Sequence, residues 1–176
     1  SANEAEVMIS ELDTAIQYMA KRRIGALISI EQGNSLEEFI NTGIPIHSDI
    51  SNQLITNIFI PNTPLHDGAV IIRDNKIAAA ACYLPLSENK MIPKELGTRH
   101  RAAIGLSEVS DAITIIISEE TGKVSVAIRE KLHRELSSSE LVAVLSEQLV
   151  VEDQGDAEPT IVRWVRDFFK GGRSNG

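Results

Sequence analysis

Hydrophobic residues recur along this chain with two different periods. In residues 4–22 they fall at Met8, Leu12, Ile16 and Met19, which is the spacing of one face of an α-helix. The same period, together with local start or stop residues, predicts further helices over residues 35–43, 50–59, 98–106, 137–149 and 161–169. We expect the apolar stripes of these helices to form part of the core.

Five shorter segments have the apolar, β-branched composition of buried strands. They are residues 25–30, 69–73, 76–83, 111–117 and 123–129. Asp74-Asn75 joins the second to the third and Ser118 to Gly122 joins the fourth to the fifth, so each pair is predicted to form a hairpin. Because helices and strands are interleaved and two hairpins are present, the predicted fold class is α/β, a single domain with a mixed central β-sheet flanked by helices.

The composition is that of one globular domain. The chain has 176 residues, of which 43% are hydrophobic, enough to bury a sizeable core. We expect residues 4–150 to form the folded unit. Residues 1–3 resemble a cloning remnant, and residues 151–176 are predicted to form an acidic linker and a C-terminal helix or tail.

Charge and cysteine content restrict the ligands. The formal net charge is -8, so the surface as a whole does not favour nucleic acid, and an anionic ligand needs a local cationic pocket or a metal. Cys82 is the one cysteine, which excludes an internal disulfide and a multi-thiolate zinc site, and its apolar neighbours predict an inert buried thiol. No spanning segment or signal peptide is visible, so we expect a soluble, cytoplasmic chain.

Three polar clusters are predicted to serve helix ends. Lys21-Arg22-Arg23 follows the first helix, where cations interact favourably with the helix dipole, and we prefer this interpretation to a phosphate site. Ser35 and Glu38 have the spacing of a capping box, and Ser137 to Glu140 predicts a cap for the helix that runs to about residue 149.

A histidine and a carboxylate stand side by side at the start of a predicted core strand. His66-Asp67 is preceded by Pro64, which restricts its own φ, and is followed by Gly68, which allows the backbone to approach another group closely. The polar pair is therefore expected in a turn at the mouth of the strand. Asp-Gly is also a common turn dipeptide, so an incidental turn remains an alternative.

A second polar stretch, Gly97 to Arg101, stands where a helix is predicted to begin. Thr98 is a good N-cap residue, which places Arg99 and Arg101 in the first turn, where the helix dipole disfavours cations by ~0.3–1 kcal/mol each. Helix N–H groups and guanidinium groups together favour bound phosphate, which is our interpretation. The alternative is that the two arginines extend into solvent or pair with Glu95 and Glu108.

Other polar residues have ordinary structural explanations. Ser118-Glu119-Glu120 is typical of an exposed turn, although a carboxylate there could hold a divalent ion or a sugar hydroxyl. The small residues Ala78 to Ala81 allow a helix or a ligand to lie close to the sheet. His47 and His133 are expected at the surface or in the core rather than as ligands.

Together these residues offer a metal ligand in His66, a base in Asp67 and phosphate-binding groups in Arg99 and Arg101. Positioning, charge neutralisation and a metal are what phosphoryl or nucleotidyl transfer needs. The chain has no Walker A sequence, which excludes a P-loop enzyme.

The segments His66 to Ala69 and Gly97 to Arg101 resemble the DGA and RHR motifs of the diadenylate cyclases, in that order and at a plausible separation. The resemblance extends from the first helix to about residue 150, and Lys21 to Ile28 is similar to the membrane-anchored CdaA/DacA type. It implies the DAC fold, and a soluble catalytic fragment that forms the cytoplasmic domain of a membrane-anchored protein.

The resemblance implies metal-dependent condensation of two ATP molecules into cyclic di-AMP, with release of two pyrophosphates. Asp67 would orient or deprotonate the attacking ribose 3′-hydroxyl, while Gly68 and Ala69 would let the nucleotide approach the backbone. His66 would bind Mn²⁺ or Mg²⁺, with Co²⁺ as a further candidate. The remaining implied nucleotide contacts are Thr98, Arg99, His100 and Arg101 at the triphosphate, Tyr83 and Leu84 at the adenine, and Ser118, Glu119 and Glu120 around nucleotide and metal.

A cyclic dinucleotide has two equivalent phosphodiesters, so each ATP must attack the other. In the family two domains face each other, which implies a catalytic homodimer here. The resemblance also implies the membrane regulator CdaR and a phosphoglucosamine mutase as partners. The alternative is a non-catalytic module that senses ATP or a dinucleotide; it would use Arg99 and Arg101 but would need neither Asp67 nor a metal.

Overall fold

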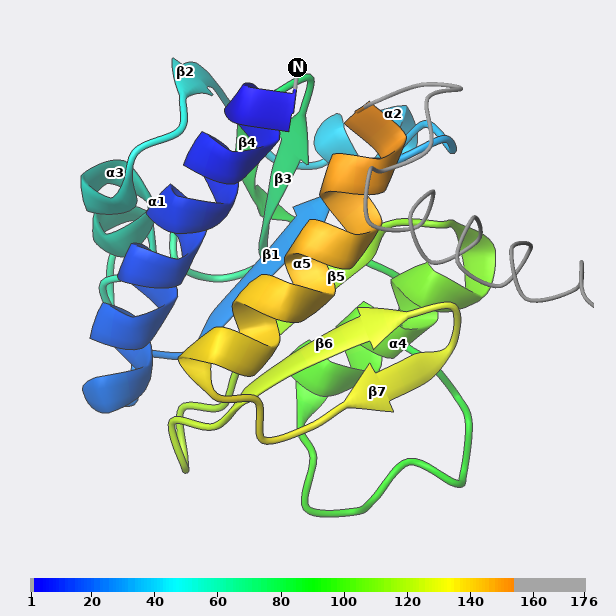
Figure 1. The fold of residues 1–176 in the computed structure, drawn as a ribbon. Helices are drawn as coiled ribbons and strands as arrows, with labels where there is room; N and C mark the ends of the chain where they lie inside the picture. The colour runs from blue at the N-terminus through cyan, green and yellow to red at the C-terminus, as the bar shows by residue number, and fades with distance from the viewer. Residues whose placement is uncertain (1, 154–176) are drawn as a thin grey trace, which may run out of the picture.

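Seven strands form one sheet at the centre of the structure, a computed structural model that describes residues 2–153 (Figure 1). The strands are β1 (Ala26–Ile30), β2 (Ile44–Asp49), β3 (Ala69–Arg73), β4 (Lys76–Cys82), β5 (Ile113–Ile117), β6 (Val124–Ile128) and β7 (Lys131–His133). Their order across the sheet is β2-β4-β3-β1-β5-β6-β7. Within the described sheet β1 and β3 are parallel and the other neighbours are antiparallel, so the predicted mixed sheet is confirmed.

Helices cover both faces of this sheet. One face packs against α1 (Ala2–Lys21), α3 (Asn52–Ile58) and α5 (Ser138–Asp153), with α1 and α5 lying side by side across it (Figure 1). The other face packs against α2 (Glu37–Ile40) and α4 (Thr98–Val109). Because both faces are covered, β1, β5 and β6 are buried along their whole length, as their runs of Ile, Leu, Val and Ala require.

Polar groups inside the sheet are paired with one another. Ser29 on β1 and Thr114 on β5 are opposite each other in the ladder, and their hydroxyl oxygens lie 2.9 Å apart. Both residues have no exposed surface. A buried hydroxyl without a hydrogen-bond partner would cost about 1–3 kcal/mol. The cross-strand pair avoids this cost, because each hydroxyl is the partner of the other.

All five predicted strands are present, and two further strands were missed. Both lie at the edges of the sheet: β2 contains Pro45 and a positive φ at His47, and β7 has three residues. An edge strand has one paired neighbour and little burial, so it leaves no alternating apolar pattern in the sequence. The tight hairpin at Asp74-Asn75 is confirmed, with positive φ at both residues.

The predicted helix ends were right in two places and wrong in one. Ser137 and Glu140 form the reciprocal cap, with the Glu140 N–H donating to Ser137 Oγ and the Ser137 N–H donating to the Glu140 carboxylate. Arg22 donates to the Tyr18 carbonyl at the end of α1. The capping box at Ser35 is wrong, because Leu36 occupies the cap position of the short helix α2 and no side chain caps it.

The predicted limits of the folded unit shift slightly. Helix α5 continues to Asp153, beyond the expected end at residue 149, and the predicted helix 161–169 lies outside the described residues. Between residues 2 and 153, none of the helices combines the length and hydrophobicity that crossing a bilayer requires. Cys82 is buried as predicted, and burial raises the pKa of its thiol to about 11.

A charged cluster replaces the predicted cap of α2. Glu31, directly after β1, accepts the Leu36 N–H at 2.7 Å and two hydrogen bonds from Arg73 Nε, at 3.0 and 3.1 Å. Arg73 Nη2 approaches the same carboxylate at 2.8 Å, and its Nη1 pairs with Glu37. Burial raises the pKa of Glu31, but the bonds from Arg73 and Leu36 outweigh that effect and hold the pKa below its ordinary value.

Replacing Arg73 with methionine is expected to lower the free energy of unfolding by about 2 kcal/mol at pH 7, because Glu31 stays largely buried without its partner. The lowered pKa of Glu31 means that this pair stabilises the fold above the ordinary carboxyl pKa near 4.5, and that the contribution is lost as pH falls. Urea unfolding at pH 7 and at pH 4 measures the difference. An equal loss at both pH values would contradict this assignment, and Glu37→Gln, at an exposed partner, is the milder control.

Candidate active site

The turn that leads into β3 approaches the bulged strand β4 at backbone distance. Gly68 has φ of +116°, and a Cβ added there would lie 2.8 Å from the Ala81 carbonyl carbon and from the Cys82 carbonyl oxygen. The register of β3 and β4 shifts between Ala69 and Ile71, and Ala81 itself has φ of +55°. The predicted close approach at Gly68 is therefore present, and it sets the direction of the preceding Asp67.

His66 is held in one orientation by its own turn. Its Nδ1 lies 2.6 Å from the Thr63 carbonyl oxygen, which can only accept, so Nδ1 carries the proton and donates. The second ring nitrogen, Nε2, is then left with the lone pair. A backbone carbonyl on the far nitrogen is the usual way in which proteins orient a histidine that binds a metal.

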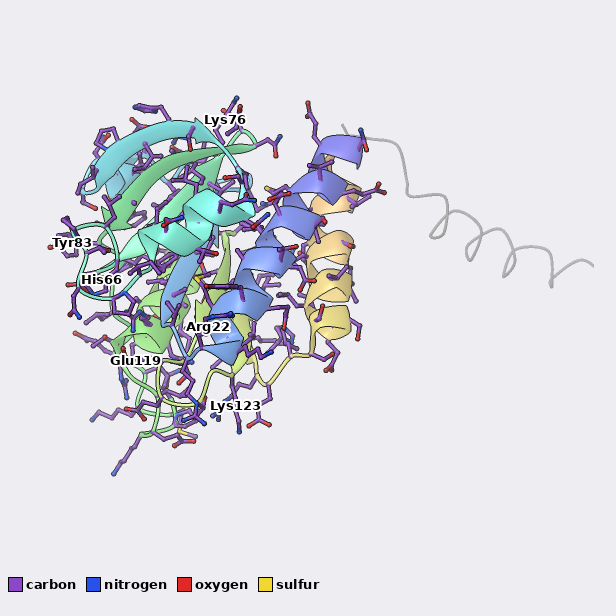
Figure 2. The ribbon with its side chains drawn as sticks, turned by 90° about the vertical axis from the view of Figure 1, so that its left-hand side faces the viewer. Arg22, His66, Lys76, Tyr83, Glu119 and Lys123 are labelled. Atoms are coloured by element: carbon purple, nitrogen blue, oxygen red, sulfur yellow. The ribbon has the colours of Figure 1, made fainter. Side chains whose placement is uncertain are left out.

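One cavity of about 400 Å³ brings the two polar stretches of the sequence together. Asp67 comes from the turn before β3, Arg99 from the first turn of α4 and Glu119 from the turn after β5. Tyr83, His66 and Glu119 lie along the same side of the domain, opposite α5 (Figure 2). The other lining residues are Leu27, Gly68, Cys82, Leu84, Leu86, Thr98 and Ala102.

Helix α4 begins without a side-chain cap. Gly97, with an extended backbone, occupies the cap position, so the prediction that Thr98 is the N-cap is wrong; Thr98 is the first helical residue. Arg99 still falls in the first turn, and its Nη1 lies 3.5 Å from a Glu119 carboxylate oxygen. Neither predicted alternative partner is used, because Glu95 pairs with Arg134 and no described ion pair joins Arg99 to Glu108. Uncapped N–H groups and a cation therefore point toward the same space.

A second, more polar cavity of about 280 Å³ adjoins the first. Thr98, Arg99 and Glu119 line both, so Arg99 stands on the wall that the two cavities share. Ser118 and Glu120 line only the second cavity, together with Lys94, which sequence reasoning did not single out. The Ser118 hydroxyl accepts the N–H groups of Glu120 and Thr121, at 3.3 Å each, and so shapes the turn that carries the two glutamates.

His100, in the first turn of α4, is almost completely buried and lines the second cavity. Burial lowers the pKa of its imidazole, and the nearby charges of Arg134 and Arg99 lower it further. His100 is therefore neutral at pH 7. It offers hydrogen bonds to a ligand but no positive charge.

Two predicted contact residues do not reach either cavity. Arg101 is two positions beyond Arg99, and residues so spaced do not share a helix face; it lines neither cavity. Ala69 has no exposed surface and packs in the core between the sheet and α4. In this structure Ala69 packs in the core and Arg99 is the one of the two arginines that lines the cavities, and the nucleotide contacts expected of Ala69 and Arg101 stay predictions. His47 and His133 are exposed and line neither cavity.

The apolar wall of the larger cavity is a loop that is hydrogen-bonded to the turn after α2 and to α4. Tyr83, 73% exposed, donates its backbone N–H to Thr42 Oγ1 at 2.9 Å, and Ser87 donates its N–H to the Arg101 carbonyl at 3.0 Å. Gly105 lies under this loop, and a Cβ there would be 1.8 Å from the Pro85 carbonyl oxygen. Gly105 was missed because a glycine inside a helical pattern shows nothing about what crosses it.

The described side chains suit a divalent ion only in combination with a ligand. Residues 2–153 contain no group of three His, Cys, Asp or Glu side chains placed to hold a metal by themselves. His66 Nε2 and the Asp67 carboxylate are adjacent donors of the types that Mn²⁺ and Mg²⁺ accept. Such ions commonly take one or two protein ligands and complete their shell with substrate phosphates and water, so the donors fit a metal that arrives with a phosphate ligand.

The chain is similar over most of its length to known proteins. The model of the DAC family, described as "DisA bacterial checkpoint controller nucleotide-binding", matches residues 13–132. The cyclic di-AMP synthase CdaA of Bacillus subtilis is 62% identical over 137 residues, which are 78% of this chain and 50% of that protein. A diadenylate cyclase of Listeria monocytogenes is 56% identical over 147 residues, 84% of this chain and 54% of that protein. The chain thus spans about half the length of these relatives.

Solved structures share the fold. A double cysteine mutant of DacA from Staphylococcus aureus superposes with a TM-score of 0.81 at 56% identity, covering 84% of this chain and 97% of that one. A hypothetical membrane spanning protein from Bacillus cereus superposes with a TM-score of 0.70 at 46% identity, covering 73% of this chain and 63% of that one.

Replacing Gly105 with alanine is expected to destabilise the protein by about 1–3 kcal/mol, because the Pro85 backbone must move. The direction of the change in the free energy of unfolding is informative, because alanine in place of glycine in an unobstructed helix would instead stabilise the protein by roughly 0.5–1 kcal/mol. Urea unfolding measures the stability, and hydrogen exchange of the Ser87 amide reports the loop, which should exchange faster. Gly97→Ala, with no atom within 4 Å of the new Cβ, is the control and should leave Ser87 protected. A stabilised Gly105→Ala protein would contradict the assignment.

Proposed function

Because this chain belongs to the DAC family of DisA-type nucleotide-binding domains, we propose that it is the catalytic domain of a diadenylate cyclase. It condenses two ATP molecules into cyclic di-AMP and releases two pyrophosphates. The observation that carries the proposal is the single cavity that unites Asp67 with Arg99 and the uncapped start of α4. The names of the B. subtilis and L. monocytogenes relatives support the same reaction.

One nucleotide spans the two adjoining cavities. The nucleoside occupies the larger cavity, where the exposed ring of Tyr83 and the side chain of Leu84 offer an aromatic face and an apolar edge to adenine. The triphosphate extends past Thr98 and Arg99 toward the smaller cavity. There the N–H groups of α4 and the guanidinium act on the same phosphates, and Ser118 and His100 add neutral hydrogen-bonding groups.

Asp67 acts on the attacking hydroxyl. The ribose 3′-oxygen of one ATP attacks the α-phosphorus of the other, and the bond from that phosphorus to the bridging oxygen of the β-phosphate breaks. Pyrophosphate leaves with the electron pair, and the 3′-hydroxyl proton passes to the Asp67 carboxylate and then to solvent. Asp67 is exposed at the mouth of the cavity, where it can reach a nucleotide that a facing molecule holds.

His66 would hold the divalent ion, Mn²⁺ or Mg²⁺, with Co²⁺ as a further candidate. When bound, the ion supplies positive charge that neutralises the triphosphate. The Thr63 carbonyl keeps the His66 ring in the orientation that this requires. Arg99, which lines the same cavity, supplies the remaining charge.

The geometry of the product requires two sites. Each of the two phosphodiesters forms by attack of one ATP on the other, so one domain with one ATP cannot align both attacks. A face-to-face homodimer brings Asp67 of one domain to the nucleotide of its partner. The whole protein, by its resemblance to relatives of the CdaA/DacA type, is proposed to be held at the cytoplasmic side of a membrane, with CdaR and a phosphoglucosamine mutase as partners.

Incubation with ATP and Mn²⁺ or Mg²⁺, followed by chromatographic separation of the products, tests the reaction. Cyclic di-AMP is expected, with two pyrophosphates for each product molecule. Activity per subunit should fall as the protein is diluted through its dimer dissociation, measured in parallel by sedimentation. Tight ATP binding without product from a dimeric sample would favour a nucleotide sensor, and full activity of a strictly monomeric sample would disprove the catalytic dimer.

Variants of Asp67 and Arg99 separate chemistry from binding. Asp67→Asn should lower kcat by roughly 10²–10⁴-fold with little change in ATP affinity, because the amide cannot take a proton. Arg99→Ala should weaken ATP binding by about 10–100-fold, the usual range for a charge-assisted bond to phosphate. Calorimetry and product formation measure the two effects. Lys123→Ala, which removes an equal charge from an exposed pair with Glu135, is the control. Turnover by Asp67→Asn would refute its role.

A further inference from the structure

Gly25 lies under the ion pair that the two cavities share. A Cβ added to Gly25 would be 2.5 Å from Arg99 Nη1, 2.8 Å from Arg99 Cζ and 3.1 Å from Glu119 Cβ. The guanidinium therefore rests directly on the backbone at the start of β1. No motif that pointed to the site includes this residue.

Position 25 needs a glycine because Arg99 lies where a side chain would begin, and not because the backbone conformation requires one. Among the described residues the glycines with positive φ are Gly68 and Gly122, so Gly25 has a backbone that an L-residue accepts. It is buried, at the junction where α1 ends and the first core strand begins. What a side chain would disturb is the guanidinium, which occupies the volume of the missing Cβ.

Neighbouring contacts seat the whole Glu119 turn on the same segment. Arg23 Nη1 donates to the Glu120 carbonyl at 3.2 Å. A Cβ at Gly122 would lie 2.3 Å from the Ala20 carbonyl oxygen, so the far side of the turn also touches this segment at backbone distance. The segment from residue 20 to residue 25 thus supports both Arg99 and the turn that carries its partner.

We propose that Gly25 is a positioning residue of the active site, which holds Arg99 on the wall shared by the nucleoside and phosphate cavities. Arg99 has no side-chain cap or acidic residue in its own helical turn to orient it. Its exposed partner Glu119 contributes little by itself, because ion pairs with a solvent-exposed carboxylate are weak. The close packing on Gly25 supplies the missing constraint, and the inference rests on the proposed function only in naming the phosphate ligand.

The first experiment uses the protein without nucleotide. In Gly25→Ala the guanidinium must leave its position, so the Nε–H signal of Arg99, assigned by NMR, should shift and exchange faster with water. Gly33→Ala is the matched control: it stands beyond the other end of β1, and its Cβ would also meet only a side-chain end, Asp111 Oδ2 at 2.8 Å. An unchanged Arg99 signal in Gly25→Ala would overturn the proposal, whatever the protein catalyses.

The second experiment is a double-mutant cycle on ATP affinity. Gly25→Ala alone should weaken ATP binding by roughly ten-fold, and Gly33→Ala should leave it unchanged. In an Arg99→Ala background the Gly25→Ala change should have no further effect on affinity. Additive losses would show that Gly25 acts by another route and would overturn the proposal. Adenosine, which lacks phosphate, should compete equally well for the wild type and Gly25→Ala.

Stability gives an independent check on the same contact. If Gly25→Ala lowers the Tm, removal of the guanidinium in Gly25→Ala/Arg99→Ala should restore it toward the Tm of Arg99→Ala. Failure of the double variant to recover would mean that the new Cβ collides with something other than Arg99, and would overturn the proposal. If the wild type makes no cyclic di-AMP, the proposed function is wrong. The Arg99 NMR signal and the Tm values, both measured without nucleotide, would still test the role of Gly25.

Discussion

The site depends on the direction in which β1 runs relative to its two neighbours. β1 is parallel to β3, with Ile28 opposite Val70, and antiparallel to β5, with Ala26 opposite Ile117. The start of β1, the start of β3 and the end of β5 therefore lie next to one another, at the same end of these three central strands. Gly25, Asp67 and Glu119 come from these three ends, although 94 positions of chain separate the first from the last. If any one of these strands ran in the reverse direction, its residue would lie at the opposite end of the strands.

Three glycines let other groups occupy positions where a side chain would stand. Gly68 admits the backbone of β4, Gly105 admits the loop at Pro85, and Gly25 admits the guanidinium of Arg99. In the first two cases backbone meets backbone, so the surroundings cannot yield without moving an element. In the third the neighbour is a flexible side-chain end. The first two glycines therefore act on the fold around the cavity, whereas the third acts on one side chain that lines it.

Positive charge in the site is confined to a few groups. The chain has a net charge of -8 and acidic side chains line both cavities, but Arg99 and the positive end of α4 lie at the same place. Glu119 neutralises Arg99 in the absence of nucleotide, at 3.5 Å and with most of the glutamate in water. Such a pair is weak, so under the proposed function a triphosphate would replace the carboxylate at small cost.

The amino-acid sequence by itself determined the fold class, the five buried strands and the turn at Asp67. Each of these follows from a local pattern: apolar periods, β-branched runs, or a glycine beside polar residues. It also selected the two motifs, because cations at a helix start are locally unfavourable and call for an anion. Only the tertiary structure decided which members of those motifs face the cavity. Arg99 reaches it and Arg101 does not, since α4 turns between them, while Ala69 is buried where β3 meets α4. The missed edge strands, the loop over Gly105 and the guanidinium on Gly25 depend on contacts between distant segments, which leave no period in the sequence.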